Sequence, residues 1–194
     1  HRDLHSFPTR RSSDLVPVQL AKEYLQDEEA FLVLMGDDFI YRHNGTSEVA
    51  AMMQTYEQSG AAALVTCIEK AESDLPRYGV AKLSEENNFR YLQALVEKPK
   101  PGTAPSNLAN ISKYILPQSV FDLIAVQQPN PASGELYITD TISQLALTEK
   151  VVIHQPQGEY LDGGYPLGWL IANLTVAKDH PELWAEIKRF VNQE

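Results

Sequence analysis

Apolar and polar residues follow two repeating patterns along most of this chain. Continuous apolar runs, rich in β-branched and aromatic residues, occupy residues 30–41 and 61–69, which is typical of strands buried on both faces. Between them, residues 46–60 have helical spacing, with Thr46 or Ser47 placed to cap the helix. Strand, helix and strand in this order predict a βαβ crossover, and therefore a sheet that is at least partly parallel.

The remaining elements continue this α/β pattern. Two extended runs joined by a polar turn predict a hairpin over residues 78–99. In the helix expected at the start, Leu20 and Tyr24 share one face, and Pro117 suits the first turn of a later helix. Further strands are expected at 107–116, 150–157 and 158–162, and further helices at 18–29, 117–126, 136–147, 166–180 and 181–194.

Composition narrows the class of protein. The 194 residues are 43% hydrophobic, enough for one domain with a substantial core, and the formal net charge is −10. An acidic chain of this kind is not expected to bind nucleic acid through its backbone phosphates. The lone Cys67 excludes an intrachain disulfide framework and fits a reducing cytoplasm. No apolar run approaches the length of about 20 residues that a membrane span needs.

Two consecutive acids follow the first apolar run, in the stretch LMGDDF. If the run is a buried parallel strand, Asp37 and Asp38 lie at the carboxyl edge of the sheet, where α/β folds bind ligands. A divalent cation would compensate two adjacent carboxylates at that edge. The alternative is a loop pair, in which one acid caps the turn and the other is solvated.

Two further stretches place charged residues at strand ends. In LVEKPK, Glu97 and Lys98 precede Pro99, and a lysine at a strand end is a compact charge suited to a phosphate. The alternative is a surface ion pair. Adjacent strand residues point to opposite faces, so the two serve one site only if the strand bends or ends there. In EYLDGGYPLGW, Asp162 ends a strand before two glycines and a helix start at Pro166, or is simply part of a turn.

Other catalytic motifs are absent from the sequence. His43 and His154 are isolated from other metal-ligating residues, and both are expected to be structural or solvated. The chain contains no G-x-S-x-G elbow, P-loop or G-x-G-x-x-G.

Taken in order, the stretches LVLMGDD, YGV, VEKPKPGTAPSNLANISKYIL, GELYITDTI and YLDGGYPLGW resemble the nucleotidyl-diphosphosugar transferases, from Val16 to the C-terminus. The resemblance implies a three-layer α/β/α fold with a Rossmann-like mixed sheet. It also implies nucleotidyl transfer from UTP to glucose 1-phosphate, with Mg²⁺ as cofactor and a homodimer or homotetramer as the full-length form. Thymidylyl, guanylyl or adenylyl transfer to another sugar 1-phosphate, and a non-catalytic sugar-nucleotide sensor, remain as alternatives.

The same resemblance assigns roles to individual residues. Asp37 and Asp162 match the two metal ligands, and Lys98 matches the lysine that contacts the phosphates. The expected sugar-pocket residues are Gly79, which offers backbone contacts, Glu97, which accepts hydrogen bonds from glucose hydroxyls, and Asn107.

The chain departs from the family pattern at its beginning. The family's first strand, its G-G-x-G-T-R loop, a following lysine segment and a base-recognition loop are not found in this sequence. Residues 5–15, HSFPTRRSSDL, can instead be reverse-translated into a common short-read sequencing adapter. We therefore predict a non-native leader over residues 1–15, rather than an Arg/Ser regulatory arm, and a partial transferase domain over 16–194. By itself this polypeptide is expected to be inactive or nearly so.

Overall fold

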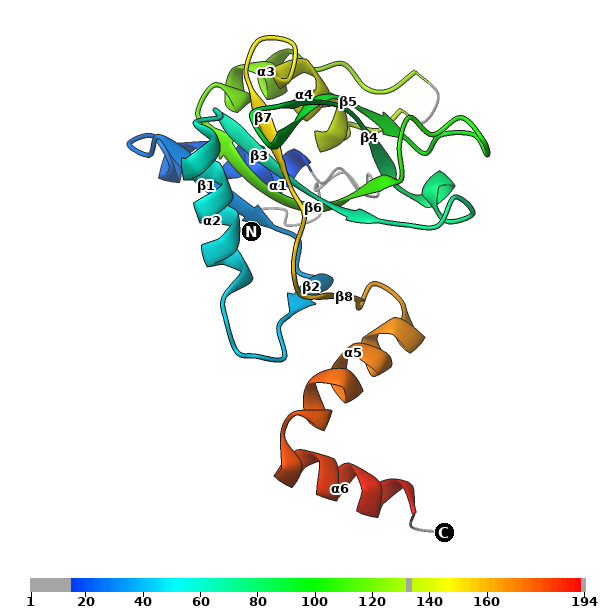
Figure 1. Ribbon diagram of the computed structural model, residues 1–194. Helices are drawn as coiled ribbons and strands as arrows, with labels where there is room; N and C mark the ends of the chain where they lie inside the picture. Colours follow the sequence, from blue (N-terminus) through cyan, green and yellow to red (C-terminus); the bar gives the residue numbers. More distant parts are fainter. Residues whose placement is uncertain (1–14, 132–133, 193–194) are drawn as a thin grey trace, which may run out of the picture.

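The computed structural model describes residues 15–131 and 134–192, which form a central mixed sheet with helices on both faces (Figure 1). The six strands of this sheet lie in the order β1-β6-β3-β7-β5-β4. Their bounds are β1 Ala30–Leu34, β3 Ala63–Glu69, β4 Gly79–Glu86, β5 Phe89–Glu97, β6 Leu108–Pro117 and β7 Val151–His154. The parallel pair is β3–β7, and the β1–β6, β3–β6, β4–β5 and β5–β7 pairs are antiparallel.

Helices cover the two faces of the sheet unequally. On one face, α1 (Leu15–Leu20), α3 (Val120–Val126) and α4 (Ile138–Leu145) pack onto the main core, with Tyr114 and Leu116 of β6 beneath them. On the other face, Met52 of α2 (Glu48–Ser59) packs against Leu64 and Val152 in a smaller core. The expected three-layer α/β/α arrangement is thus confirmed.

A second, two-stranded sheet connects this body to the C-terminal helices. It pairs β2 (Asp38–Tyr41) with β8 (Glu159–Asp162), and α5 (Pro166–Lys178) and α6 (Pro181–Val191) continue away from the main sheet (Figure 1). Two short 3₁₀ turns, η1 (Ala21–Tyr24) and η2 (Leu75–Arg77), complete the described elements. Among the described residues, no helix is long and apolar enough to cross a membrane.

Several local predictions are confirmed. The crossover from β1 through α2 to β3 exists, although β6 lies between the two strands and is antiparallel to both. The Ser47 hydroxyl accepts a hydrogen bond from Ala50 N at 3.2 Å, and Gly60 ends α2 in the left-handed conformation. The hairpin turn is formed by Asn87 and Asn88, whose φ angles of 52° and 66° suit a tight turn between twisted strands.

Other local predictions are wrong. The apolar run 30–41 forms two strands in different sheets, and β1 is an edge strand with Leu34 about half exposed (48%). In the first helix the buried residues are Leu15 and Val18, which lie three residues apart on one face, whereas Leu20 and Tyr24 point to solvent. Pro117 is the last residue of β6 rather than the start of α3.

The predicted leader lies almost entirely outside the described residues. Its last residue, Leu15, belongs to α1 and is 1% exposed in the main core. The origin of the other leader residues stays a prediction.

Candidate active site

The β2–β8 ribbon brings Asp37 and Asp162 together. Asp38 pairs in register with Asp162, and Gly163 N donates a hydrogen bond of 2.8 Å to the carbonyl oxygen of Asp37. A Cβ atom placed on Gly164 would lie 3.2 Å from Asp162 Oδ1 and 3.4 Å from Asp37 Oδ2. Two carboxylates from segments 125 residues apart therefore converge on one glycine, which has no side chain to fill the space between them.

The two adjacent acids of LMGDDF have separate roles in the structure. Asp37 is exposed, whereas Asp38 is buried in an ion pair with the ammonium group of Lys113 and accepts a 2.9 Å hydrogen bond from the Tyr160 hydroxyl. Burial raises the pKa of Asp38, and the contacts with Lys113 and Tyr160 oppose that shift. Asp38 thus fastens the small ribbon to β6, and only Asp37 is available to a ligand.

Gly79, Glu97 and Lys98 form a second group, where β4 begins and β5 ends. Gly79 begins β4 and is paired in register with Glu97, the last residue of β5. A Cβ atom on Gly79 would lie 3.0 Å from Glu97 Oε2, so a larger residue would make this carboxylate shift by a few tenths of an ångström. Lys98 has a φ angle of 45°, and its Nζ lies 3.8 Å from Glu97 Oε1. The strand therefore ends with both side chains on one side, as a shared site requires.

Two residues that the sequence interpretation did not single out support this group. Thr139 Oγ1 donates a hydrogen bond of 3.2 Å to Glu97 Oε2, and the Lys98 ammonium lies 5.7 Å from the centroid of the Tyr137 ring. Both residues belong to the stretch GELYITDTI, which carried part of the family resemblance. The sequence could therefore have indicated that these two residues belong to the site. Their contacts with Glu97 and Lys98, however, depend on how α4 packs on the sheet.

Tyr78 lies between the two groups. Its carbonyl oxygen accepts a hydrogen bond of 3.0 Å from Lys98 N. Its ring and Asp162 line the same pocket, of about 260 Å³. Burial raises the pKa of the Tyr78 hydroxyl, and the negative charge of Asp162 adds to that effect. Among the described residues, no direct hydrogen bond joins Asp37 or Asp162 to Glu97 or Lys98.

Asn107 lies at the rim of the same region. Its side chain is exposed, and its carbonyl oxygen accepts a hydrogen bond of 3.0 Å from Lys70 N. The Lys70 ammonium lies over the rings of both Tyr78 and Tyr160, at 5.5 and 5.1 Å from their centroids. Asn107 is thus connected to the pocket through Lys70 and not directly to Glu97.

The donor set at Asp37 and Asp162 fits a magnesium ion. Within residues 15–131 and 134–192, no group of three or more histidine, cysteine or acidic side chains could hold a metal by itself. Mg²⁺ is commonly bound by one or two carboxylates, with water and substrate phosphates completing its coordination. Two converging carboxylates match that chemistry.

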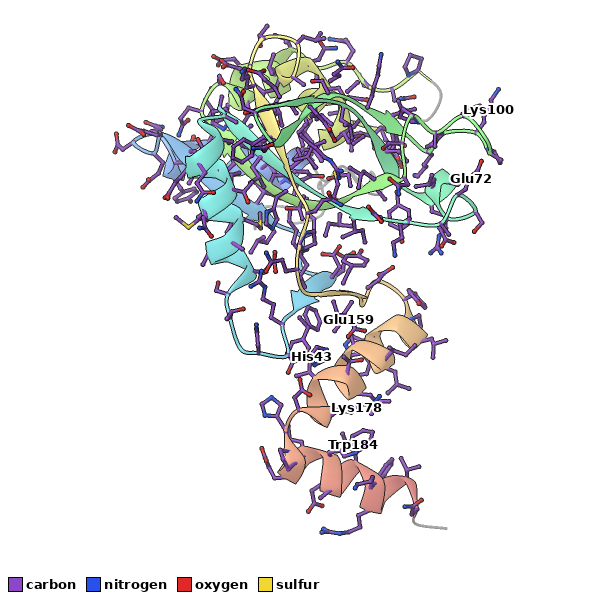
Figure 2. The ribbon with its side chains drawn as sticks, in the orientation of Figure 1. His43, Glu72, Lys100, Glu159, Lys178 and Trp184 are labelled. Atoms are coloured by element: carbon purple, nitrogen blue, oxygen red, sulfur yellow. The ribbon has the colours of Figure 1, made fainter. Side chains whose placement is uncertain are left out.

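The two isolated histidines are structural. Beneath α2, His154 is hydrogen-bonded through Nε2 to Glu48 Oε1 (2.8 Å) and through Nδ1 to Thr55 Oγ1 (2.9 Å). His43 lies 2.6 Å from Asp179 Oδ2, at the C-terminal end of α5, and 3.2 Å from Glu159 Oε2, and Figure 2 shows it beside Glu159. Neither histidine contacts the acids that converge on Gly164.

Comparisons with known proteins agree with this arrangement. A family model described as nucleotidyl transferase matches residues 12–178. Curated relatives named UTP–glucose-1-phosphate uridylyltransferase come from Staphylococcus epidermidis, with 34% identity, and Staphylococcus haemolyticus, with 32% identity. Each match covers 91% of this chain and 60% of the relative.

Solved structures show the same likeness in three dimensions. A UDP-glucose pyrophosphorylase complexed with UDP-glucose is 27% identical with a TM-score of 0.77, over 87% of this chain and 63% of that one. A UTP-bound enzyme from Acinetobacter baumannii is 30% identical with a TM-score of 0.76, over 91% of this chain and 60% of that one. This chain therefore spans about three-fifths of the length of the proteins it matches.

Proposed function

Because the chain belongs to the nucleotidyl transferase family, we propose that the whole protein transfers a uridylyl group from UTP to glucose 1-phosphate. The products are UDP-glucose and pyrophosphate. Relatives at 32–34% identity carry that activity in their names, and the structures it resembles were solved with UDP-glucose and with UTP. The buried Cys67 and the lack of other cysteines fit a reaction in the reducing cytoplasm.

The observation that carries the proposal is the convergence of Asp37 and Asp162 on Gly164. Two carboxylates brought together without a buried counter-charge repel each other, and a cation relieves that repulsion. Asp38 is excluded from this role because its carboxylate is occupied by Lys113 and Tyr160. In our proposal Asp37 and Asp162 hold Mg²⁺.

The reaction requires positioning and charge neutralisation rather than covalent catalysis. An oxygen of the sugar phosphate attacks the α-phosphorus of UTP in line, the bond to pyrophosphate breaks, and the negative charge spreads over the phosphate oxygens. When bound, Mg²⁺ supplies neutralisation of that charge. The exposed Lys98 ammonium, at the end of β5, is the cation of this chain that we assign to the phosphates.

The sugar is assigned to the group around Glu97. A carboxylate accepts hydrogen bonds from hydroxyl groups, and Thr139 fixes the position of Glu97 by donating to Oε2. Gly79 leaves room beside that carboxylate, so the backbone of β4 can approach a sugar ring closely. We place Asn107 at the rim of the same pocket, next to Lys70.

The proposal can be tested by ligand binding to this chain. We expect glucose 1-phosphate to bind more tightly with Mg²⁺ than with EDTA, measured by titration calorimetry, because the metal joins the phosphate to the two carboxylates. In a form of the protein that also carries the base-recognition loop, UTP is expected to be used in preference to ATP or dTTP. Asp162→Asn should abolish the dependence on Mg²⁺, and Asp27→Asn, an exposed acid remote from the ribbon, should not.

Two results would overturn the proposal. One is binding of glucose 1-phosphate that is indifferent to both Mg²⁺ and Asp162→Asn. The other is equal use of UTP, ATP and dTTP by the form that carries the base-recognition loop, which would remove the uridylyl assignment while leaving the sugar-phosphate site intact.

A further inference from the structure

A large pocket lies outside the candidate active site. It has a volume of about 730 Å³, compared with about 260 Å³ for the pocket beside Asp162. Ligand pockets in proteins span about 300–1,000 Å³, so its size is sufficient for a small molecule. Its walls are α2, the turn between β4 and β5, and the end of β7 with the loop that follows. We refer to it as the α2–hairpin groove.

The groove is separated from the candidate active site by the length of the hairpin. Gly79 and Glu97 are paired at one end of β4 and β5, and Glu86 and Phe89 are paired at the other. Glu86 follows Gly79 by seven residue steps along β4, which corresponds to roughly 23 Å. None of the residues assigned to the metal or the sugar phosphate lines the groove.

The lining of the groove is dominated by carboxamides. Its amide side chains are Gln54, Gln58, Asn87, Asn88, Gln155 and Gln157. The side chains of Gln54, Gln58 and Gln157 make no hydrogen bond with another described residue. Each amide presents donors and an acceptor without a charge, so together they match a ligand with many hydroxyl groups.

Charged groups at the groove are already compensated. Glu85 is paired with Arg90 at 3.0 Å, and Glu86 with Lys150 at 3.0 Å. His154, another residue of the groove wall, hydrogen-bonds Glu48 and Thr55. The arginine of the lining, Arg90, already pairs with Glu85 and donates to Gln155, and the one phenyl ring, Phe89, offers little surface to an apolar ligand. A single half-buried ring among amides instead suits the C–H face of a sugar.

We propose that the α2–hairpin groove is a second ligand site, which binds an uncharged saccharide. The ligand stacks its C–H face on Phe89 and exchanges hydrogen bonds with the glutamines of α2 and of the β7–β8 loop. The site is independent of nucleotidyl transfer, because it uses none of the residues assigned to the metal, the phosphates or the transferred sugar.

The test is a titration of the ¹⁵N-labelled chain with glucose, galactose and maltose, followed by amide chemical shifts. We expect at least one of these sugars to shift the amides of Asn88 and Gln157, with dissociation constants in the millimolar range. The double variant Gln54→Ala/Gln157→Ala removes two exposed partners and should weaken binding about fivefold or more, as expected for lost neutral hydrogen bonds. Gln93→Ala, an exposed glutamine of β5 outside the groove, is the matched control and should change affinity less than twofold.

Three outcomes would overturn the proposal. The first is the absence of shifts at the groove with all three sugars. The second is shifts confined to residues near Gly79 and Glu97, which would support the proposed function and not this site. The third is binding of inorganic phosphate in the groove in preference to sugar, which would show that charge and not hydroxyl recognition governs it.

Discussion

The Lys98 ammonium lies 3.8 Å from the carboxylate of its sequence neighbour Glu97, although adjacent residues of a strand normally point to opposite faces. The left-handed backbone at Lys98, with a φ angle of 45°, ends β5 and turns the lysine to the side of Glu97. A non-glycine residue in this conformation costs about 1–2 kcal/mol. The backbone at Lys98 thus sets the relative positions of two candidate ligand-binding groups.

This conformation leads to a prediction for Lys98→Gly. Glycine adopts positive φ at little cost, so the variant should unfold at an equal or slightly higher denaturant concentration than the parent. Because the ammonium group is lost, its affinity for glucose 1-phosphate should fall by about tenfold, the equivalent of one charge-assisted contact. Chemical denaturation and calorimetry on the same samples check both. A variant that binds normally would contradict the phosphate role.

A second prediction concerns Asp37. In a form of the protein that turns over, Asp37→Ala should lower pyrophosphate release from UTP and glucose 1-phosphate by about 10²–10³, as loss of one catalytic charge contact usually does. The fold should be preserved, since Asp37 is exposed and its side chain supports no core contact. A loss smaller than about tenfold would argue against the metal assignment, because removing a contact of this kind costs about 2.7–4 kcal/mol.

A third prediction follows from the crowding around Gly79. In Gly79→Ala the new methyl group meets Glu97 Oε2 at 3.0 Å and Thr139 Cγ2 at 3.2 Å, so the carboxylate must shift. We expect the KM for glucose 1-phosphate to rise about tenfold with a smaller change in kcat, the pattern of a lost ground-state contact. The same crowding should lower the free energy of unfolding. Adding Thr139→Ser removes the contact with Cγ2 and should recover part of that stability, but it should not restore the KM. Recovery of both would show that Glu97 is not the sugar contact.

The buried group beneath α2 gives a prediction about stability. Glu48, 8% exposed, accepts a hydrogen bond of 2.5 Å from Arg42 Nε and is 2.8 Å from His154 Nε2. Arg42 Nη2 is buried without a partner among the described residues. Glu48→Gln leaves that guanidinium uncompensated and should lower the free energy of unfolding by about 3 kcal/mol at pH 7.

The same substitution has a defined pH dependence. Burial by itself would raise the pKa of Glu48, but the hydrogen bonds with His154 and Arg42 outweigh it and lower the pKa. A carboxylate with a lowered pKa stabilises the fold above its unfolded pKa, and that contribution is lost as pH falls. The difference between parent and Glu48→Gln should therefore shrink below about pH 4.5. Glu57→Gln, an exposed acid of the same helix, should show neither effect.

A final prediction concerns the junction at which the β2–β8 ribbon contacts the C-terminal end of α5. His43 lies between Asp179 and Glu159, with the Tyr41 ring edge-on at 4.9 Å. The hydrogen bond that the His43 ring donates to Asp179, followed by the one that it donates to Glu159, raises the pKa of His43, and the bond with His43 lowers the pKa of Asp179. The His43 contribution is present below its unfolded pKa and disappears as pH rises. The Asp179 contribution disappears as pH falls.

The junction should therefore be tightest between about pH 4 and pH 6.5, the ordinary values of the two groups. An NMR titration of the His43 ring checks this by giving a pKa above the ordinary value. Asp179→Asn should bring it back towards that value, and Glu182→Gln, on the neighbouring helix, should leave it unchanged. An identical titration in parent and Asp179→Asn would refute the assignment.

Much of the secondary structure was predictable because local physics determines it. The buried run of β3, the Asn87–Asn88 turn, the Ser47 cap and the helix starts at Pro166 and Pro181 all follow from residue types and spacing. The division of residues 30–41 into two strands was not predictable in this way. An apolar run has the same appearance whether one sheet or two receive it, and pairing with β6 and β8 decides between them.

The sequence by itself determined which groups this protein has available, namely two acids of a GDD stretch, a Glu-Lys pair before a proline, and an aspartate before two glycines. Only the tertiary structure decided how they are used. Antiparallel pairing of β2 with β8 brings Asp37 to Asp162, Lys113 of β6 removes Asp38 from any ligand site, and α4 delivers Thr139 to Glu97. The physical reason is that charge and helical or strand spacing are local properties. The contacts that distinguish a ligand-binding carboxylate from a structural one join residues tens of positions apart.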